Sequence, residues 1–222
     1  MKQTTIKPFE ILDEGVLQEI NQFTKRVHFK KGEMLFANGE LSRYFYVVQT
    51  GKIKTYQLNL DNAKEQTIFV FRAGDMFDTI TLLDGEPHDV MYEAMEDSVA
   101  FEMPIENVRY LIEHNPEFNR KFFPYLAKQM RHMEELVSDI SLYSTEERLI
   151  KLLLQNLDPT NRMRYNLLHG LSNSEIAKLI GTVRHVIERH LKKLKKEGLL
   201  EDKSKTLQMN SAKALLEKIK LF

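Results

Sequence analysis

A helix-turn-helix pattern between residues 171 and 200 constrains the fold of this chain more than any other feature of the sequence. Ser172 and Glu175 stand three positions apart and form a capping box, which satisfies two backbone N–H groups at the start of a helix. Apolar residues then recur at helical spacing as far as Gly181, which permits the left-handed backbone of a tight turn. The pattern therefore predicts two helices joined at a steep angle.

The second predicted helix begins at about Val183 and ends before Gly198. Its buried face is expected to contain four apolar residues spaced 4, 4 and 3 positions apart, namely Val183, Ile187, Leu191 and Leu194. This spacing leaves four polar side chains facing outward: Arg184, His185, Glu188 and Arg189. Such a face suits the major groove of DNA, where arginine can donate two hydrogen bonds to guanine. The alternative is an ordinary helical hairpin with a solvated charged face.

Basic and hydroxyl side chains accompany this pattern. Beyond Gly198 the hydrophobic period shifts toward two, which predicts a short hairpin, or wing, formed by residues 199–201 and 206–209. A plain surface hairpin fits this segment equally well on its own. The side chains expected to contact DNA phosphates are Ser172, Ser174, Thr182, Lys192, Lys193, Lys203 and Lys205.

The charge of the chain is unevenly distributed. The whole sequence has 32 Lys and Arg against 32 Asp and Glu, a balance that by itself argues against a nucleic-acid-binding protein. Residues 1–144 have 16 basic and 23 acidic side chains, which gives a net charge of −7. Residues 145–222 have 16 basic and 9 acidic side chains, which gives a net charge of +7. The positive charge therefore accompanies the helix-turn-helix pattern, as contact with phosphates requires.

The sequence contains no cysteine. A disulfide framework, an iron–sulfur cluster, a cysteine-ligated zinc site and a thiol redox sensor are therefore excluded. The start of the chain lacks the apolar core of a signal peptide, and no apolar run approaches the roughly 20 residues that a membrane span requires. We expect a cytoplasmic protein.

A segment rich in β-branched and aromatic residues runs from Val27 to Met103, after a short predicted helix at 13–23. Turn signals interrupt this segment about every 10 to 12 residues, a spacing typical of short antiparallel strands in a roll or barrel. The strongest predicted strands are 44–48 and 67–71. A chain of 222 residues can bury one large core or two modest ones, and the division of charge favours two domains.

Helical spacing returns after Pro104 and extends from Pro116 to about Ser141, with Pro124 expected to kink the helix or mark the start of its straight part. A heptad seam lies within this helix, at Leu126, Met130, Met133, Val137 and Ile140. Because it spans only about two heptads, an isolated coiled coil would be marginal, and the seam could instead pack on the chain's own β-roll. We predict a homodimer, since a helix-turn-helix usually needs a two-fold partner to contact two half-sites.

A second capping box, from Ser144 to Glu147, opens another amphipathic helix, so the junction at 141–144 is the expected hinge. The sequence thus predicts an α+β chain with three parts. These are a β-roll effector or sensor domain at 1–115, a dimerisation helix with its hinge at 116–143, and a winged helix-turn-helix domain at 144–222.

This order of parts resembles the Crp/Fnr family of bacterial transcription regulators over nearly the full length, with matching segments at 31–33, 46–53, 71–77, 147–149 and 175–189. The resemblance implies a roll like that of cyclic-nucleotide-binding domains, a double-stranded β-helix. It also implies a homodimer that binds a pseudo-palindromic duplex and contacts RNA polymerase.

The resemblance also implies roles for residues of the second helix. Two arginines five positions apart contact guanine and neighbouring groups in the family, and they correspond to Arg184 and Arg189. His185 stands where the family usually has Glu, so a changed half-site is expected. Val183 stands where a capping Ser is common, and Thr182 is expected to cap the helix one residue earlier.

The expected effector pocket departs from the family members that bind cyclic AMP. Their ribose-binding Glu and phosphate-binding Arg–Ser pair correspond to Thr79, His88 and Asp89. Loss of the arginine removes charge-assisted hydrogen bonds and Asp89 adds repulsion, so cyclic AMP is disfavoured and no cofactor is identified. Another small molecule is expected to meet Phe71, Phe77, Thr79, His88 and Asp89, although the aromatic residues fit a packed core equally well.

Two other functions compete with DNA binding. A cupin-like metal enzyme or a small-molecule-binding domain with an accessory helix-turn-helix is the main alternative, but metal chemistry needs clustered ligands. His28, His88 and His114 are isolated in the sequence, so no catalytic or metal-binding residue is assigned. A cyclic-nucleotide sensor without a DNA role is disfavoured by the missing arginine and by the helix-turn-helix pattern.

Overall fold

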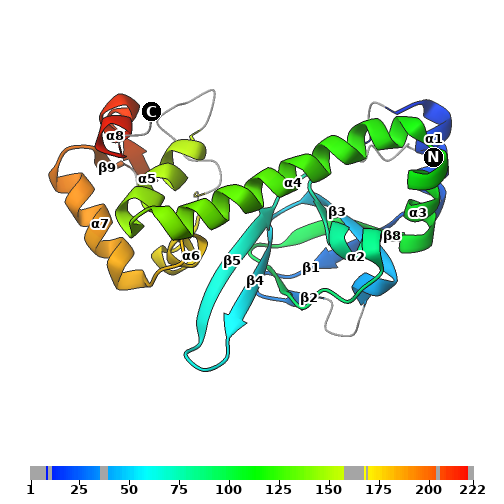
Figure 1. Cartoon of the computed structure of the whole chain (residues 1–222), viewed down its shortest axis with the longest axis horizontal. Helices are drawn as coiled ribbons and strands as arrows, with labels where there is room; N and C mark the ends of the chain where they lie inside the picture. Colours follow the sequence, from blue (N-terminus) through cyan, green and yellow to red (C-terminus); the bar gives the residue numbers. More distant parts are fainter. Residues whose placement is uncertain are drawn as a thin grey trace. The chain divides into compact units, whose positions relative to one another are not determined.

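The computed structural model describes residues 9, 12–35, 40–157, 168, 170–203 and 206–219. The chain forms two compact units, the first from residues 1–57 and 68–133 and the second from residues 58–67 and 134–222. An antiparallel β-roll, a long helix and a C-terminal helix-turn-helix follow one another along the chain (Figure 1), which confirms the predicted α+β fold. The domain boundaries expected from the sequence stay a prediction. Within the described ranges, no helix is long and apolar enough to cross a membrane.

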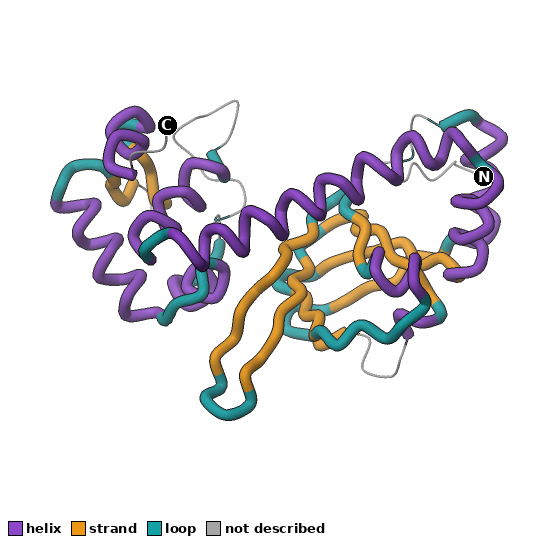
Figure 2. The backbone as a smooth tube through the Cα atoms, in the orientation of Figure 1, coloured by secondary structure: helices purple, strands orange, loops and turns teal. Residues whose placement is uncertain are grey.

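Two four-stranded sheets build the roll, whose strands are orange in Figure 2. The first sheet has the order β1 (Lys25–Phe29), β8 (Ser98–Pro104), β3 (Tyr44–Thr50) and β6 (Met76–Phe77). The second has the order β2 (Met34–Leu35), β7 (Met91–Ala94), β4 (Ile53–Asn59) and β5 (Lys64–Phe71). The pairs β1–β8, β3–β8, β2–β7 and β4–β7 are antiparallel, as the predicted roll requires.

Strand β3 contributes to two hydrophobic cores, because its side chains alternate between the faces of the sheet. Phe45 and Val47 pack in a core formed with the helices of the first unit. Tyr46 and Val48 pack in the core between the two sheets, together with aromatic residues of the other strands. All four side chains are at most 2% exposed, so this strand is covered on both of its faces.

Three helices close the first core: α1 (Glu14–Phe23), α3 (Ile105–His114) and the start of α4 (Pro116–Leu142). Phe118 and Phe122 of α4 are buried, and the hydroxyl of Tyr125 accepts from the backbone N of Met76 and donates to its carbonyl. These contacts attach the start of α4 to strand β6. Helix α4 continues across Pro124, which lies inside it.

Two further elements of the first unit are a 3-10 turn (Glu40–Ser42) and a short helix, α2 (Thr79–Asp84), neither of which the sequence pattern indicated. Helix α2 begins directly after Asp78, whose backbone is left-handed. Arg109 of α3 donates to the carbonyl oxygens of Thr81 (3.1 Å) and Leu82 (3.0 Å), which attaches α2 to α3.

The second unit contains α5 (Thr145–Gln155), α6 (Asn173–Leu179), α7 (Arg184–Lys196), β9 (Leu200–Lys203), β10 (Thr206–Met209) and α8 (Ala212–Ile219). Its core combines apolar residues from all of these elements. Leu215 and Ile219 of α8 complete that core, although α8 was not predicted from the sequence.

Candidate nucleic-acid interface

Both capping boxes that the sequence predicted are present. The hydroxyl of Ser172 accepts from the backbone N of Glu175 (3.2 Å), and the Glu175 carboxylate accepts from the backbone N of Ser172 (2.6 Å). The reciprocal pair at the start of α5 joins Ser144 and Glu147. These hydrogen bonds to Ser144 lower the pKa of Glu147. The starts of α5 and α6 are therefore fixed by their own sequence.

The turn between α6 and α7 has the geometry that Gly181 was expected to provide. Gly181 has a φ of +68°, and the backbone N of Thr182 donates to the carbonyl of Ala177 at 2.9 Å. Ala177 is only 1% exposed, so its small side chain lies at a closely packed position of the unit. Ile176 and Ile180 are buried on the same helix stripe, which holds α6 against the core.

Helix α7 buries most of its predicted apolar face. Ile187, Leu191 and Leu194 are at most 7% exposed. Val183 is 46% exposed, so its assignment to the buried face was wrong. It is the N-cap residue, with an extended backbone that directs it away from the helix stripe. Thr182 therefore does not occupy the N-cap position that the sequence analysis gave it.

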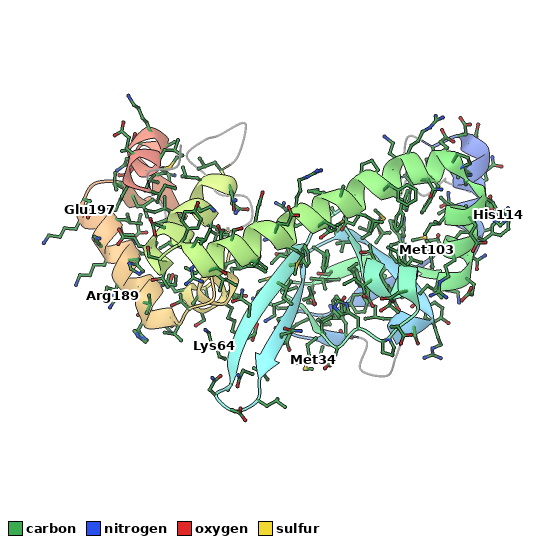
Figure 3. The ribbon with its side chains drawn as sticks, in the orientation of Figure 1. Met34, Lys64, Met103, His114, Arg189 and Glu197 are labelled. Atoms are coloured by element: carbon green, nitrogen blue, oxygen red, sulfur yellow. The ribbon has the colours of Figure 1, made fainter. Side chains whose placement is uncertain are left out.

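The four polar side chains predicted to face outward are exposed: Arg184, His185, Glu188 and Arg189. Figure 3 labels Arg189 on α7, together with Glu197 at the end of the helix. Nε of Arg184 donates to Oε1 of Glu188 at 2.6 Å, and this hydrogen bond lowers the pKa of Glu188. Arg184 is thus held along the helix by a partner four residues away.

Behind this face lies a charged cluster that sequence reasoning missed, here called the Glu146 cluster: Glu146, His190, Lys193 and Lys218. The Glu146 carboxylate lies 2.7 Å from Nζ of Lys193, and Nε2 of His190 lies 2.9 Å from the Thr145 hydroxyl. Burial lowers the pKa of His190, although the charge of Glu146 opposes this effect. The cluster links α7 to α5 and α8. No local signal marks it, because its members are far apart in the sequence.

Helix α7 ends in a Schellman motif at Gly198. The backbone N of Gly198 donates to the Lys195 carbonyl and that of Leu199 donates to the Leu194 carbonyl, with φ of Gly198 at +73°. Strands β9 and β10 follow as an antiparallel pair, which confirms the predicted hairpin.

The residues expected to contact phosphate are distributed along this unit. Lys192 and Lys193 are exposed, whereas Ser174 and Thr182 are half-buried. The Ser172 hydroxyl is already used as the helix cap. Lys205 and the side chain of Lys203 lie outside the described residues.

The residues expected to form an effector pocket have different environments. Phe71 and Phe77 belong to the core between the sheets, with ring centroids 5.5 Å apart. Thr79 is half-buried and Asp89 is exposed. His88 instead contacts Asp78, with Nδ1 and Oδ1 2.9 Å apart. Asp78 was missed, although an acid directly after the 71–77 motif and ten positions before a histidine was a usable signal.

A β-roll followed by a winged helix-turn-helix defines a class of two-part transcription regulators. Residues 26–115 match the family model described as the cyclic nucleotide-binding domain, and residues 147–218 match the one described as the Crp-like helix-turn-helix domain. The chain belongs to the Crp/Fnr family of transcription regulators.

Individual relatives share this organisation over most of their length. The chain is 28% identical over 210 residues to the protein named cyclic AMP receptor protein of Thermus thermophilus, covering 93% of this chain and 92% of that one. A CooA variant from Carboxydothermus hydrogenoformans has a similar structure, with a TM-score of 0.77 at 22% identity over 99% of this chain and 97% of that one. The structure of FixK2 from Bradyrhizobium japonicum is also similar, with a TM-score of 0.75 at 21% identity. The match covers 87% of this chain and 96% of that one. These two structures have the same fold.

Proposed function

We propose that this regulator is a homodimer that binds a specific pseudo-palindromic DNA site with α7 as its recognition helix. The observation that carries the proposal is the exposed face of α7, where Arg184, His185, Glu188 and Arg189 lie beyond a tight left-handed turn. The net charge of +7 in residues 145–222 supplies the attraction to phosphates. Base-edge contacts by the two arginines supply the selectivity.

The hydrogen bond between Arg184 and Glu188 affects how Arg184 can contact a base. Glu188 either holds the guanidinium in the geometry for guanine or competes with the base for it. The Glu188→Gln variant separates these roles. A loss of base selectivity would support the role in which Glu188 holds the guanidinium. A gain of DNA affinity with selectivity intact would support competition with the base. Lys192 and Lys193 follow on the same helix and contact phosphate in this proposal.

A mobility-shift experiment on randomised duplex at several salt concentrations tests the proposal. The protein is expected to select a pseudo-palindrome with half-sites about one helical turn apart. Arg184→Ala is expected to lose about 1–3 kcal/mol and to relax preference at one base position. Lys192→Ala, the matched cation, is expected to weaken all sequences alike and to flatten the salt dependence. Uniform weakening by both variants would refute the assigned roles.

The proposed dimer rests on the α4 seam, defined by Leu126, Met130, Met133, Val137 and Ile140. Met130 and Val137 are 67% and 60% exposed, and Met133 and Ile140 are also exposed. Leu126 packs partly against the first core. Since Met130 and Met133 of the first unit face solvent in a single chain, burial of the seam by a second copy is favoured over packing on that unit's own roll.

The ligand of the roll is proposed to differ from cyclic AMP. His88 and Asp89 stand where the phosphate-binding pair is expected, and His88 is engaged by Asp78. In a thermal-shift measurement, cyclic AMP is expected to leave the unfolding temperature unchanged, and a large stabilisation would contradict this assignment. Contact with RNA polymerase and a cytoplasmic location are proposed from the family alone.

No enzymatic activity is proposed. Among the described residues, no group of three or more His, Asp or Glu side chains is placed to hold a metal ion. The metal-enzyme alternative therefore has no supporting geometry in that part of the chain.

A further inference from the structure

Asp78 is a buried acid in an uncommon backbone conformation. It joins β6 to α2 with φ +56° and ψ +50°, the left-handed region that residues other than glycine seldom adopt. Its side chain is 2% exposed, and Oδ1 lies 2.9 Å from Nδ1 of His88. Backbone strain and burial of a charge at one residue are both costly, and such costs concentrate at binding sites.

The other carboxylate oxygen of Asp78 is unsatisfied. Oδ2 is buried and has no hydrogen-bond partner among the described residues, and the same holds for Oγ1 of Thr81 on the following turn of α2. Buried oxygens of this kind are nearly always paired in folded proteins, because an unpaired one loses its hydration without compensation. Asp78 thus has a buried acceptor that no donor of the described residues satisfies.

The surroundings of Asp78 are negatively charged. The hydrogen bond that His88 donates to the Asp78 carboxylate raises the pKa of His88; burial opposes this, and the charges of Asp78, Asp84 and Asp89 add to it. The nearby cation Arg109 is already engaged, since it donates to two carbonyls of α2 and to the Glu106 carboxylate. A protonated His88 offsets one of these charges, but the three carboxylates together still disfavour an anionic group at this position and favour a cationic donor.

Phe77, the residue directly before Asp78, packs against Tyr92 in the buried aromatic core. Burial and the charge of Asp78 raise the pKa of Tyr92, whose ring is 5.7 Å from that of Phe77. A metal ion is not indicated, because the described residues contain no cluster of three or more ligating side chains.

We propose that the β-roll binds a small organic cation, a primary ammonium compound, whose N–H group donates to Oδ2 of Asp78. Thr81 provides a second acceptor through Oγ1. The site lies wholly within the first unit and does not depend on the proposed DNA binding, so either proposal can fail without the other.

Calorimetric titration of the full-length protein tests this site directly. The probes are primary ammonium ions from methylammonium to benzylammonium, each paired with the alcohol and the carboxylate of the same carbon skeleton, at constant ionic strength. For at least one skeleton, the ammonium ion is expected to bind about tenfold or more tightly than the alcohol, because its hydrogen bond is charge-assisted. The carboxylate, inorganic phosphate and cyclic AMP are expected not to bind.

Two variants test whether the preference for ammonium depends on the charge of Asp78. Asp78→Asn keeps the shape and the acceptor for His88 but removes the charge, and it is expected to abolish the preference for ammonium. Asp89→Asn removes the same charge from an exposed neighbour and is expected to retain that preference. If Asp78→Asn fails to fold, the proposal is still tested by the affinities of the natural protein for each ammonium ion and for the alcohol of the same skeleton.

Three results would overturn the proposal. They are an equal affinity for alcohol and ammonium in every skeleton, a preference for ammonium that survives in Asp78→Asn, and binding of phosphate or cyclic AMP in place of the ammonium ions. Absence of binding by all probes would mean that Oδ2 meets only solvent, which also overturns it.

Discussion

His88 and His190 have pKa values shifted in opposite directions by their neighbours. His88 donates to the carboxylate of Asp78, which favours its charged form and raises its pKa. His190 contacts Thr145 and Glu146 of α5, and burial favours its neutral form and lowers its pKa despite the charge of Glu146. His88 lies in the first unit and His190 in the second, so these two residues contribute to the pH dependence of their units with opposite sign.

The signs follow from linkage between protonation and folding. The contribution of His88 to folding is complete below the unfolded-state pKa of about 6.5 and is lost as pH rises through its raised folded-state value. The contribution of His190 is complete above about 6.5 and is lost as pH falls toward its lowered value. NMR titration of the histidine ring protons is expected to give a midpoint above 6.5 for His88 and below 6.5 for His190, each signal identified by its absence in His88→Gln or His190→Gln. Midpoints on the same side would contradict the assignment.

Residues whose environment is set by their sequence neighbours could be predicted from the sequence. Residues whose partners lie far away in the sequence could not. The exposed side chains of α7 follow from helical periodicity, and so do Ile187, Leu191 and Leu194 on its buried face. The partners of His190 depend on distant segments, so no local pattern indicated them. Asp78 had a usable signal in its place after the 71–77 motif, but no local pattern indicated its burial. The exposure of Val183 was missed because a helix start leaves the periodic stripe.

At the scale of elements, the capping boxes make the helix-turn-helix a locally specified structure. The first turn of α6 is closed by Ser172, while Ser174, two positions on, forms no part of the box. Helices α5 and α6, which begin with such capping boxes, were predicted correctly from the sequence. Helices α2 and α8 were not, because both are short and depend on packing against other elements.

The two serines offer a test that separates stability from DNA binding. Ser172→Ala is expected to destabilise the second unit by about 1 kcal/mol, because it leaves a helix N–H group without its cap. Ser174→Ala is expected to leave the unfolding temperature unchanged and to weaken DNA binding, as its proposed phosphate contact requires. Thermal unfolding and mobility shift of each variant provide the two readouts. An equal loss of stability in both would contradict the cap assignment.

Two glycines with open space around them differ only in backbone conformation. Neither Gly198 nor Gly15 has an atom within 4 Å of an added Cβ, but Gly198 has a φ of +73°. Gly198→Ala is expected to cost about 1 kcal/mol, because a residue with a Cβ is strained in the left-handed region. Gly15→Ala, in helix α1, is expected to stabilise by about 0.5 kcal/mol. Denaturant unfolding measures both, and the same sign of change in the two variants would contradict the argument.

At the scale of the whole molecule, assembly and charge are linked. The α4 seam leaves apolar side chains in solvent, and residues 145–222 concentrate positive charge. A dimer would bury the seam and present two such cationic regions to one duplex. The sequence predicted the heptad spacing but not the exposure of its side chains, which the structure shows for Met130 and Met133 of the first unit.

Substitution within α4 tests the assembly. Val137→Lys places a charge in the seam and is expected to yield a monomer, because a buried unpaired ammonium is strongly unfavourable. Ser138→Lys adds the same charge at the adjacent exposed position, away from the seam, and is expected to remain dimeric. Light scattering after gel filtration gives the mass of each. A natural protein that is monomeric at micromolar concentration, or a Val137→Lys variant that stays dimeric, would exclude the proposed seam.

The position of β3 between two cores restricts how this protein can evolve. A one-residue insertion or deletion within the strand would exchange Phe45 and Val47 with Tyr46 and Val48, and so disrupt both cores at once. It would also displace the Tyr46 hydroxyl from the Glu102 carboxylate, 3.1 Å away. Changes in chain length among descendants of this protein should therefore be confined to the turns, while β3 diverges by replacement alone.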